Sequence, residues 1–249
     1  MYLTIKGLVL RVTVYNDTDA LLTLLTHSHG KLTVKARGLR RKNSPLAAPC
    51  QLLSYGEFTL FHHKDMYTIN EAHPVSLFLP LRNDIIKLSL ASYFAQVSEL
   101  LCQEDMPNPE LLSLLLNCLY ALSELPVDEK LVKAVFELRS ACLSGFAPDL
   151  SRCIHCGRTF ADRLDLSEGH LSCAACHVPG SGSIRMPLTA GALDAMRYIC
   201  GCDKQKLFSF QISGESLTCL SQVTESHLLT QLERGFSTLD FYKSLLFEP

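Results

Sequence analysis

The chain has 249 residues, enough for one large domain or two ordinary ones, and no window holds about 18 uninterrupted apolar residues, so we expect no membrane-spanning helix. The formal net charge of −2 conceals an uneven distribution: residues 1–80 have nine basic and five acidic side chains, whereas residues 81–150 have five basic and ten acidic ones. A basic amino-terminal part on an acidic body suggests that one face of the molecule meets a polyanion.

The eleven cysteines are an odd number, and several lie in apolar stretches with a helical pattern. The first residues show no basic segment followed by an apolar core and a small-residue cleavage site, so we expect no secretory signal. Both features are typical of the reducing cytosol, and we expect a cytoplasmic location.

The first eighty residues have the period-two alternation of β-strands. Gly30 closes a turn, where a glycine can adopt positive φ without strain. Short strands separated by such turns favour a small closed barrel. We predict five strands, over residues 3–14, 20–26, 31–37, 52–62 and 66–72.

The third predicted strand and the loop after it hold the candidate functional residues. Leu32, Val34 and Ala36 fall on one face, and the alternating positions on the other face are polar or basic. Six cations within twelve residues repel one another unless an anion is near, so we predict that they bind the phosphates of a nucleic acid. The alternative is a solvated polar face. The six are Lys31, Lys35, Arg37, Arg40, Arg41 and Lys42.

Aromatic side chains close to this segment in sequence have two possible roles. They could stack on unpaired bases, or they could fill the core of the barrel, which is the commoner fate of such residues. They are Tyr55, Phe58, Phe61 and Tyr67.

From Pro80 onward the apolar period becomes helical. Capping residues or prolines begin several segments, and Gly145 suits the end of one of them. With the strands before them, the helices make the chain an α+β protein. We predict helices over residues 84–102, 109–122, 128–145, 189–201 and 224–246.

Two cysteine pairs give the sharpest motif. Cys153 and Cys156 have two residues between them, as do Cys173 and Cys176, and sixteen residues separate the pairs. This spacing is typical of a closed four-thiolate zinc site that holds structure together and leaves no position for a catalytic water. The alternatives are disulfides, a redox pair, or a site in which His155, His170 or His177 replaces one cysteine. The segment 179–183 after the second pair has the composition of a flexible connector.

Signatures of catalysis are missing from the sequence. It has no Gly-x-x-x-x-Gly-Lys-Ser/Thr loop, no Gly-x-Ser-x-Gly elbow and no His-Glu-x-x-His motif. We read Cys102, Cys118 and Cys142 as core residues and Cys200 and Cys202 as helix-end residues. We therefore expect that the protein has no catalytic residues and is not an enzyme.

Four segments of the chain resemble the RecO family of bacterial recombination mediators, which act in DNA damage repair and DNA recombination. The most specific is residues 145–157 (GFAPDLSRCIHCG), with the family's Gly-x-x-Pro-x-Leu-x-x-Cys-x-x-Cys-Gly pattern. Residues 30–40 (GKLTVKARGLR) are similar to its barrel strand and basic loop. Residues 188–193 and 239–245 are similar to its carboxy-terminal helices.

This resemblance implies an amino-terminal OB-fold β-barrel over residues 1–80, followed by an α-helical domain over 81–249. A zinc finger bound by Cys153, Cys156, Cys173 and Cys176 would be inserted at about 150–183. The resemblance also implies binding of single- and double-stranded DNA and annealing of complementary strands without ATP. Implied partners are RecR and single-stranded DNA-binding protein, to help load RecA in a cytoplasmic, nucleoid-associated setting.

Two other classes of protein stay open on the residues alone. One is an RNA-binding or transcription-associated zinc-ribbon protein. The other is a scaffold, in which the acidic helices bind one partner and the basic face binds another protein.

Overall fold

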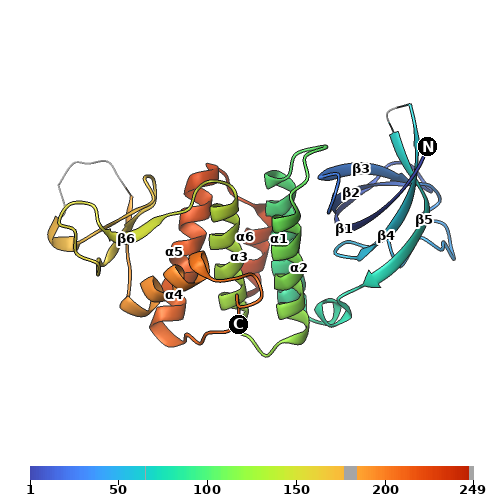
Figure 1. The fold of residues 1–249 in the computed structure, drawn as a ribbon. Coiled ribbons are helices and arrows are strands. Elements are labelled where there is room, and N and C mark those ends of the chain that lie inside the picture. Colours follow the sequence, from blue (N-terminus) through green and yellow to red (C-terminus); the bar gives the residue numbers. More distant parts are fainter. Residues whose placement is uncertain (65, 177–183, 247–249) are drawn as a thin grey trace. The chain divides into compact units, whose positions relative to one another are not determined.

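The computed structural model describes residues 1–64, 66–176 and 184–246, and the chain divides into two compact units (Figure 1). One unit joins Met1–Glu124 to the chain from Phe236 onward, and the other is Leu125–Gly235. The domain boundary expected at residues 80 and 81 stays a prediction. His177, the connector at 179–183 and the expected end of the zinc segment at 183 lie outside the described residues. No described helix is both long and apolar enough to span a bilayer.

Five strands form the predicted barrel in the first unit. They are β1 (Tyr2–Val14), β2 (Ala20–Thr26), β3 (Lys31–Ala36), β4 (Tyr55–His63) and β5 (Met66–Ser76). Their order around the closed barrel is β1-β2-β3-β5-β4. Only the β3–β5 pairing is parallel, and closure leaves no open sheet edge.

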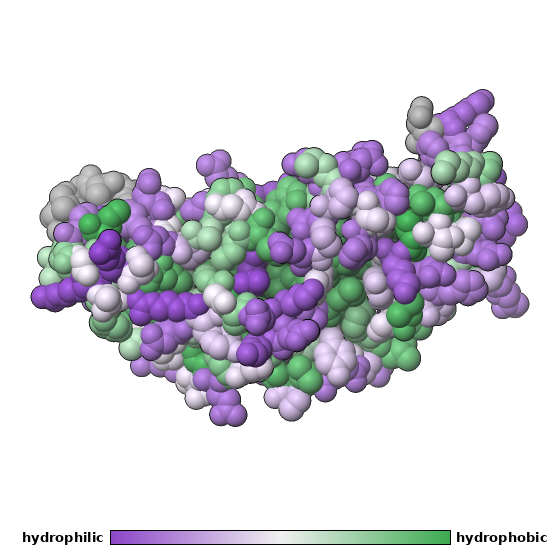
Figure 2. Space-filling model, in the orientation of Figure 1, coloured by the Kyte–Doolittle hydropathy of each residue, from purple (hydrophilic) through white to green (hydrophobic). Residues whose placement is uncertain are grey.

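Alternation along the strands produces the barrel core. Leu3 lies opposite Leu60 and Ile5 opposite Phe58, and all four contribute to the apolar cluster inside the barrel. The residues between them point outward. On the face shown in Figure 2, the barrel surface is mostly hydrophilic with smaller apolar patches.

Three α-helices complete the first unit: α1 (Ile85–Leu101), α2 (Pro109–Glu124) and α6 (Ser237–Leu246). A short 3₁₀ helix, η1 (Leu79–Asn83), leads into α1, whose amino terminus is capped by the Asp84 carboxylate. Arg11 of β1 and Glu99 of α1 form an ion pair with 2.9 Å between nitrogen and oxygen. This pair joins the barrel to the first helix.

The long final helix predicted over residues 224–246 is wrong. The chain instead forms α5 (Gly214–Leu232), a break with Glu233 in the left-handed conformation, and α6. The break allows Phe236, which is 2% exposed, to meet the Tyr93 ring at a centroid distance of 5.6 Å. Tertiary burial of one aromatic ring thus overrides the helical pattern of the segment.

The second unit combines helices with a small sheet. Its helices α3 (Glu129–Leu143), α4 (Ala190–Gly201) and α5 pack together. The strands β6 (Asp149–Cys153), β7 (Arg163–Asp165), β8 (His170–Ser172) and β9 (Arg185–Pro187) pair in the order β6-β8-β7-β9. These strands were not predicted, since three of the four have only three residues and show no alternation.

The cysteines in and next to the helices differ in burial. Cys102 and Cys118 are buried, as predicted. Cys142 is half-buried, and its Sγ lies 3.7 Å from Sγ of Cys200. This contact joins the carboxy-terminal ends of α3 and α4.

A buried charge cluster joins α3 to α5. Lys133 Nζ lies 2.9 Å from Glu137 Oε1 and 2.8 Å from Glu225 Oε2, and Lys133 and Glu137 are almost wholly buried. Thr224 donates a hydrogen bond of 3.0 Å to Glu137. Burial raises the pKa of Glu137, although Lys133 acts in the opposite direction. The cluster is therefore stable only while its cation is present.

Replacing Lys133 with Met should destabilise the protein by about 3–5 kcal/mol, because the substitution removes the cation that neutralises Glu137. A carboxyl group whose pKa is raised on folding favours the folded state at low pH, and this contribution is lost as pH rises. The loss of unfolding free energy in the variant, measured by denaturant unfolding, should therefore be smaller at pH 5 than at pH 8. Lys130→Met, at an exposed position of the same helix, is the control. An equal loss of unfolding free energy at both pH values would contradict the view that the unneutralised Glu137 carboxylate causes it.

Candidate nucleic-acid interface and metal centre

The β3 strand displays the alternation that the sequence predicts. Leu32, Val34 and Ala36 point into the barrel core, and Lys31 and Lys35 lie on its outer face. Arg37 follows the end of the strand and is exposed. The turns after it carry Arg40, Arg41 and Lys42, which are also exposed. The predicted cations therefore lie on β3 and in one adjoining loop.

Three of the six cations already have partners within the protein. Lys31 Nζ donates to the backbone oxygen of Glu99 at 3.2 Å, and Arg40 Nη1 donates to that of Asn16 at 3.0 Å. Lys35 Nζ lies 3.2 Å from Asp19 Oδ2 and 4.5 Å from the centre of the Tyr15 ring. These contacts position the strand and the loop, and they leave Lys35 largely neutralised.

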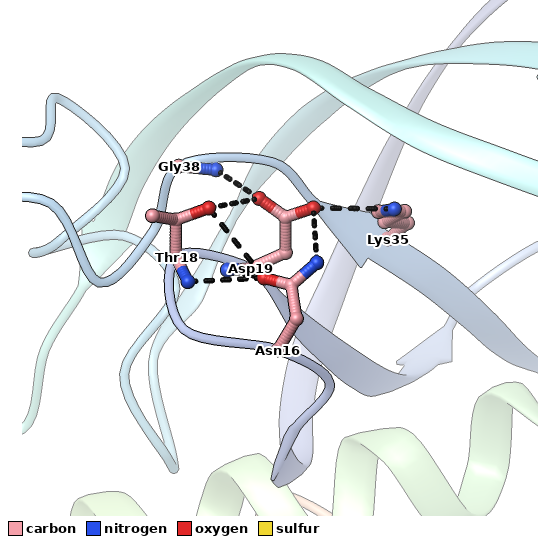
Figure 3. Close-up of polar contacts among 5 residues, drawn as sticks. All are labelled: Asn16, Thr18, Asp19, Lys35 and Gly38. Atoms are coloured by element: carbon pink, nitrogen blue, oxygen red, sulfur yellow. Dashed lines mark hydrogen bonds and ion pairs between the residues drawn. The ribbon is translucent and has the colours of Figure 1, made fainter.

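Asp19 organises this end of the barrel (Figure 3). Its carboxylate accepts hydrogen bonds from the Gly38 backbone N–H at 2.8 Å and the Thr18 hydroxyl at 3.1 Å, beside the Lys35 ion pair. The Gly38 hydrogen bond is the main reason that the pKa of Asp19 is far below its ordinary value of 3.8, with Lys35 contributing less and partial burial acting against both. The start of the basic loop is thereby fastened to the turn before β2.

Beyond Gly38 the loop is a series of turns. Arg41 N–H donates to Gly38 O at 3.1 Å, and Ser44 N–H donates to Arg41 O at 3.2 Å. The loop then anchors itself by burying Leu46 in the barrel core. Among the described residues, no carboxylate pairs with Arg37, Arg41 or Lys42. We call these three the free cations.

Asp19 was not predicted as a site residue, although a local sequence signal for its turn is present. Asn16 Oδ1 accepts the backbone N–H groups of Thr18 and Asp19, which is the hydrogen bonding of an Asx turn. The contacts of Asp19 with Lys35 and Gly38 depend on the pairing of β2 with β3. No local pattern in the sequence specifies that pairing.

The four aromatic residues for which the sequence left two roles open differ in burial. Phe58 is fully buried, and Tyr67 packs against the barrel core. Tyr55 is partly buried. Phe61 is 38% exposed.

The four cysteines of the paired motif meet at one point. The sulfur atoms of Cys153, Cys156, Cys173 and Cys176 all lie within 4.8 Å of one another, and those of Cys156 and Cys173 are 3.7 Å apart. A tetrahedral site with metal–sulfur bonds of about 2.3 Å requires sulfur separations of about 3.8 Å. The four thiols can therefore hold a metal ion. Neither His155 nor His170 belongs to the group.

Backbone geometry brings the two pairs together. Gly157, with a φ of 73°, turns the chain so that its N–H donates to Cys153 O at 2.9 Å. Burial raises the pKa of Cys153, but the N–H groups of Cys156, His155 and Cys173 outweigh it and lower that pKa to about 6. A thiol that ionises readily is a good metal ligand.

The cysteine group is tied to the helices of the second unit. From α4, Arg197 donates hydrogen bonds to the backbone oxygens of Leu150, Ser151 and Thr159, the first at 2.9 Å. From α5, Gln231 donates to the backbone oxygen of Leu166 at 2.7 Å. The small sheet and the cysteines are thus an extension of this helical unit.

Comparison with known proteins identifies the family. The model for the recombination protein O N terminal matches residues 1–78, and the model for the recombination protein O C terminal matches residues 82–240. The chain belongs to the RecO family. Its two matched segments include the barrel cations and all four clustered cysteines.

Relatives match along nearly their whole length. The DNA repair protein RecO of Acetivibrio thermocellus is 34% identical over 98% of this chain and 97% of its own. RecO of Heliobacterium modesticaldum is 38% identical over 98% of this chain and 92% of its own. RecO of Alkaliphilus metalliredigens is 30% identical over 98% of this chain and its entire length.

Replacing Asp19 with Asn should lower the thermal unfolding temperature at pH 7, because the basic loop loses its anchor. A carboxyl group whose pKa is depressed on folding stabilises the fold above its unfolded pKa, and this contribution is lost as pH falls. The difference in unfolding temperature between wild type and variant should therefore narrow from pH 5 to pH 2. Asp17→Asn, at a neighbouring exposed acid, should have little effect. A difference that does not depend on pH would argue against the ionised carboxylate as the anchor.

Proposed function

We propose that the chain is a DNA-binding recombination mediator in DNA repair. The observation that carries the proposal is the full-length match to the RecO family, in which the matched amino-terminal barrel bears Arg37, Arg41 and Lys42 without anionic partners among the described residues. Exposed cations without a protein anion favour a polyanionic ligand. The substrates proposed are single- and double-stranded DNA.

The free cations suggest how the barrel acts on DNA. Arg37, Arg41 and Lys42 would neutralise phosphates, with the loop held in place by Asp19. Shielding two strands at once lowers their mutual repulsion, so that complementary bases can search for register. Since the sequence lacks a nucleotide-binding loop, we propose that annealing proceeds without ATP.

Lys31, Lys35 and Arg40 have a different part in this proposal. Each of the three is already bonded within the barrel unit, and together they hold β3 and the loop in place. Lys31 and Arg40 are bonded to neutral backbone oxygens, so their charges still add to the positive field around the site, whereas the charge of Lys35 is offset by Asp19.

The proposed partners follow from membership of the family. They are RecR and single-stranded DNA-binding protein, with the loading of RecA as the result. We also propose that the chain acts in the cytoplasm, in association with the nucleoid, and has no catalytic residues of its own.

We propose zinc as the metal of the four-cysteine centre. Four thiolates within 4.8 Å of one another suit zinc, and a site filled by four protein ligands has a structural role. In that role the metal would hold the small sheet together and keep it attached to α4 and α5.

Replacing both Arg41 and Lys42 with Gln should weaken binding of a labelled single-stranded oligonucleotide about tenfold at 100 mM salt. The slope of log affinity against log salt concentration should become shallower by about one to two units, since each neutralised phosphate releases roughly one counterion. Nucleotide-free annealing of complementary oligonucleotides should slow in parallel.

The control removes the same charge elsewhere. Lys130 and Lys206 are exposed and lie outside the barrel, and changing both to Gln should leave the salt slope unchanged. If both double variants reduced affinity equally, binding would depend on net charge, and the barrel loop would not be the DNA site.

Replacing Cys156 with Ser should remove most of the bound zinc, which wild-type protein should hold at about one ion per chain, because only three thiolates are left. Elemental analysis of purified protein measures this content. Cys202→Ser, outside the sulfur cluster, should keep the metal. Full zinc occupancy of the Cys156 variant would exclude that residue as a ligand.

A further inference from the structure

The outer face of the barrel carries an aromatic group that the basic loop does not include. Tyr2 is 63% exposed and Phe61 is 38% exposed, and their rings meet at a centroid distance of 5.2 Å. The ring of His63 continues the row, 6.2 Å from that of Phe61 and inclined to it by 15°. Apolar side chains that are exposed as a group, unlike those exposed singly, often mark a binding site.

Strand register places these rings on one face. Tyr2 of β1 lies opposite Phe61 of β4, and Phe61 lies opposite Thr68 of β5. Thr68 is in turn the parallel neighbour of Lys35 on β3. The aromatic row and the basic strand therefore share the outer surface of the barrel, at the end where the chain begins beside the β4–β5 hairpin (Figure 1).

The rings border a depression of about 500 Å³. Its lining combines the apolar surfaces of Tyr2, Phe61 and Met66 with the cationic side chains of Arg37 and Lys64. No acidic side chain is among the described residues that line it. Arg37 is also one of the free cations, so the depression is continuous with the proposed phosphate-binding surface.

We propose that this depression binds the unpaired bases of single-stranded nucleic acid, with Tyr2 and Phe61 as stacking surfaces and Arg37 and Lys64 contacting the adjacent phosphates. Aromatic rings next to cations suit a ligand that alternates flat apolar bases with phosphates. In a duplex the faces of the bases are covered by their neighbours, so only an unpaired strand can use the rings. This inference rests on the proposed function and names the form of DNA that this part of the barrel holds.

The test separates stacking from charge. Phe61→Leu is measured with a labelled oligothymidine and with an abasic strand of the same length, which keeps the phosphates but has no bases. Affinity for oligothymidine should fall about tenfold, since one base–aromatic stack contributes roughly fivefold to more than a hundredfold. Affinity for the abasic strand should change less than twofold. Tyr120→Leu, at an exposed aromatic residue of α2, is the matched control and should change neither.

A second variant gives an optical readout and does not depend on the stability of the first. The chain contains no tryptophan, so Phe61→Trp introduces a single tryptophan, whose fluorescence can be excited separately from that of the eight tyrosines. Its emission should be quenched on saturation with oligothymidine and unchanged with the abasic strand. Tyr120→Trp should show no quenching with either strand.

The outcomes also separate this inference from the proposed function. If wild-type protein binds neither strand, both proposals are overturned. If it binds both strands with the expected salt dependence and Phe61→Leu changes neither affinity, or lowers both equally, stacking alone is overturned. Unchanged affinities would be the result if the depression instead held an apolar segment of a partner protein.

Discussion

The carboxylate of Asp19 is the constraint on which the basic end of the barrel depends. It binds the Gly38 N–H and the Lys35 ammonium group together, and so holds the end of β3 and the start of the following loop against the turn before β2. Without this anchor, the cations from Arg37 to Lys42 would repel one another and the loop would spread. The same carboxylate is paired with Lys35, so the charge of Lys35 is not available to a ligand. The surface left for phosphate is therefore smaller, and better ordered, than the charge of the sequence suggests.

Sequence patterns correctly predicted those parts of the fold that depend on interactions between residues close together in the chain. Alternation in β3 identified its buried face, because a pleated strand sends successive side chains to opposite sides. Asp128 and Thr189, the first residues of two predicted helices, cap helices in the structure, since a cap needs only the N–H groups two or three residues ahead. The spacing of the cysteines was equally informative, because two tight turns can meet around one ion whatever surrounds them.

The predictions failed where distant residues decide the outcome. The final helix breaks because Phe236 is buried against Tyr93, which no helical period can reveal. In the candidate site, the six cations were correctly placed on β3 and its loop, but their partners were invisible in the sequence. Lys31 binds a backbone oxygen 68 residues away, and Phe61 meets Tyr2 only through the pairing of β1 with β4. Sequence composition thus indicates where charge and aromatic rings occur, whereas topology decides which of them are left for a ligand.

The break before α6 has a consequence for synthesis on the ribosome. Helix α6 belongs to the unit that begins at Met1, so the segment Leu125–Gly235 is an insertion in the chain of that unit. The inserted unit is complete before the last residues emerge, and it can fold while the barrel unit still lacks Phe236 and Leu239. Until those two side chains arrive, the surface of α1 that they cover stays open to water and to other chains. The amino-terminal unit, although made first, therefore cannot complete its core until the last helix is available.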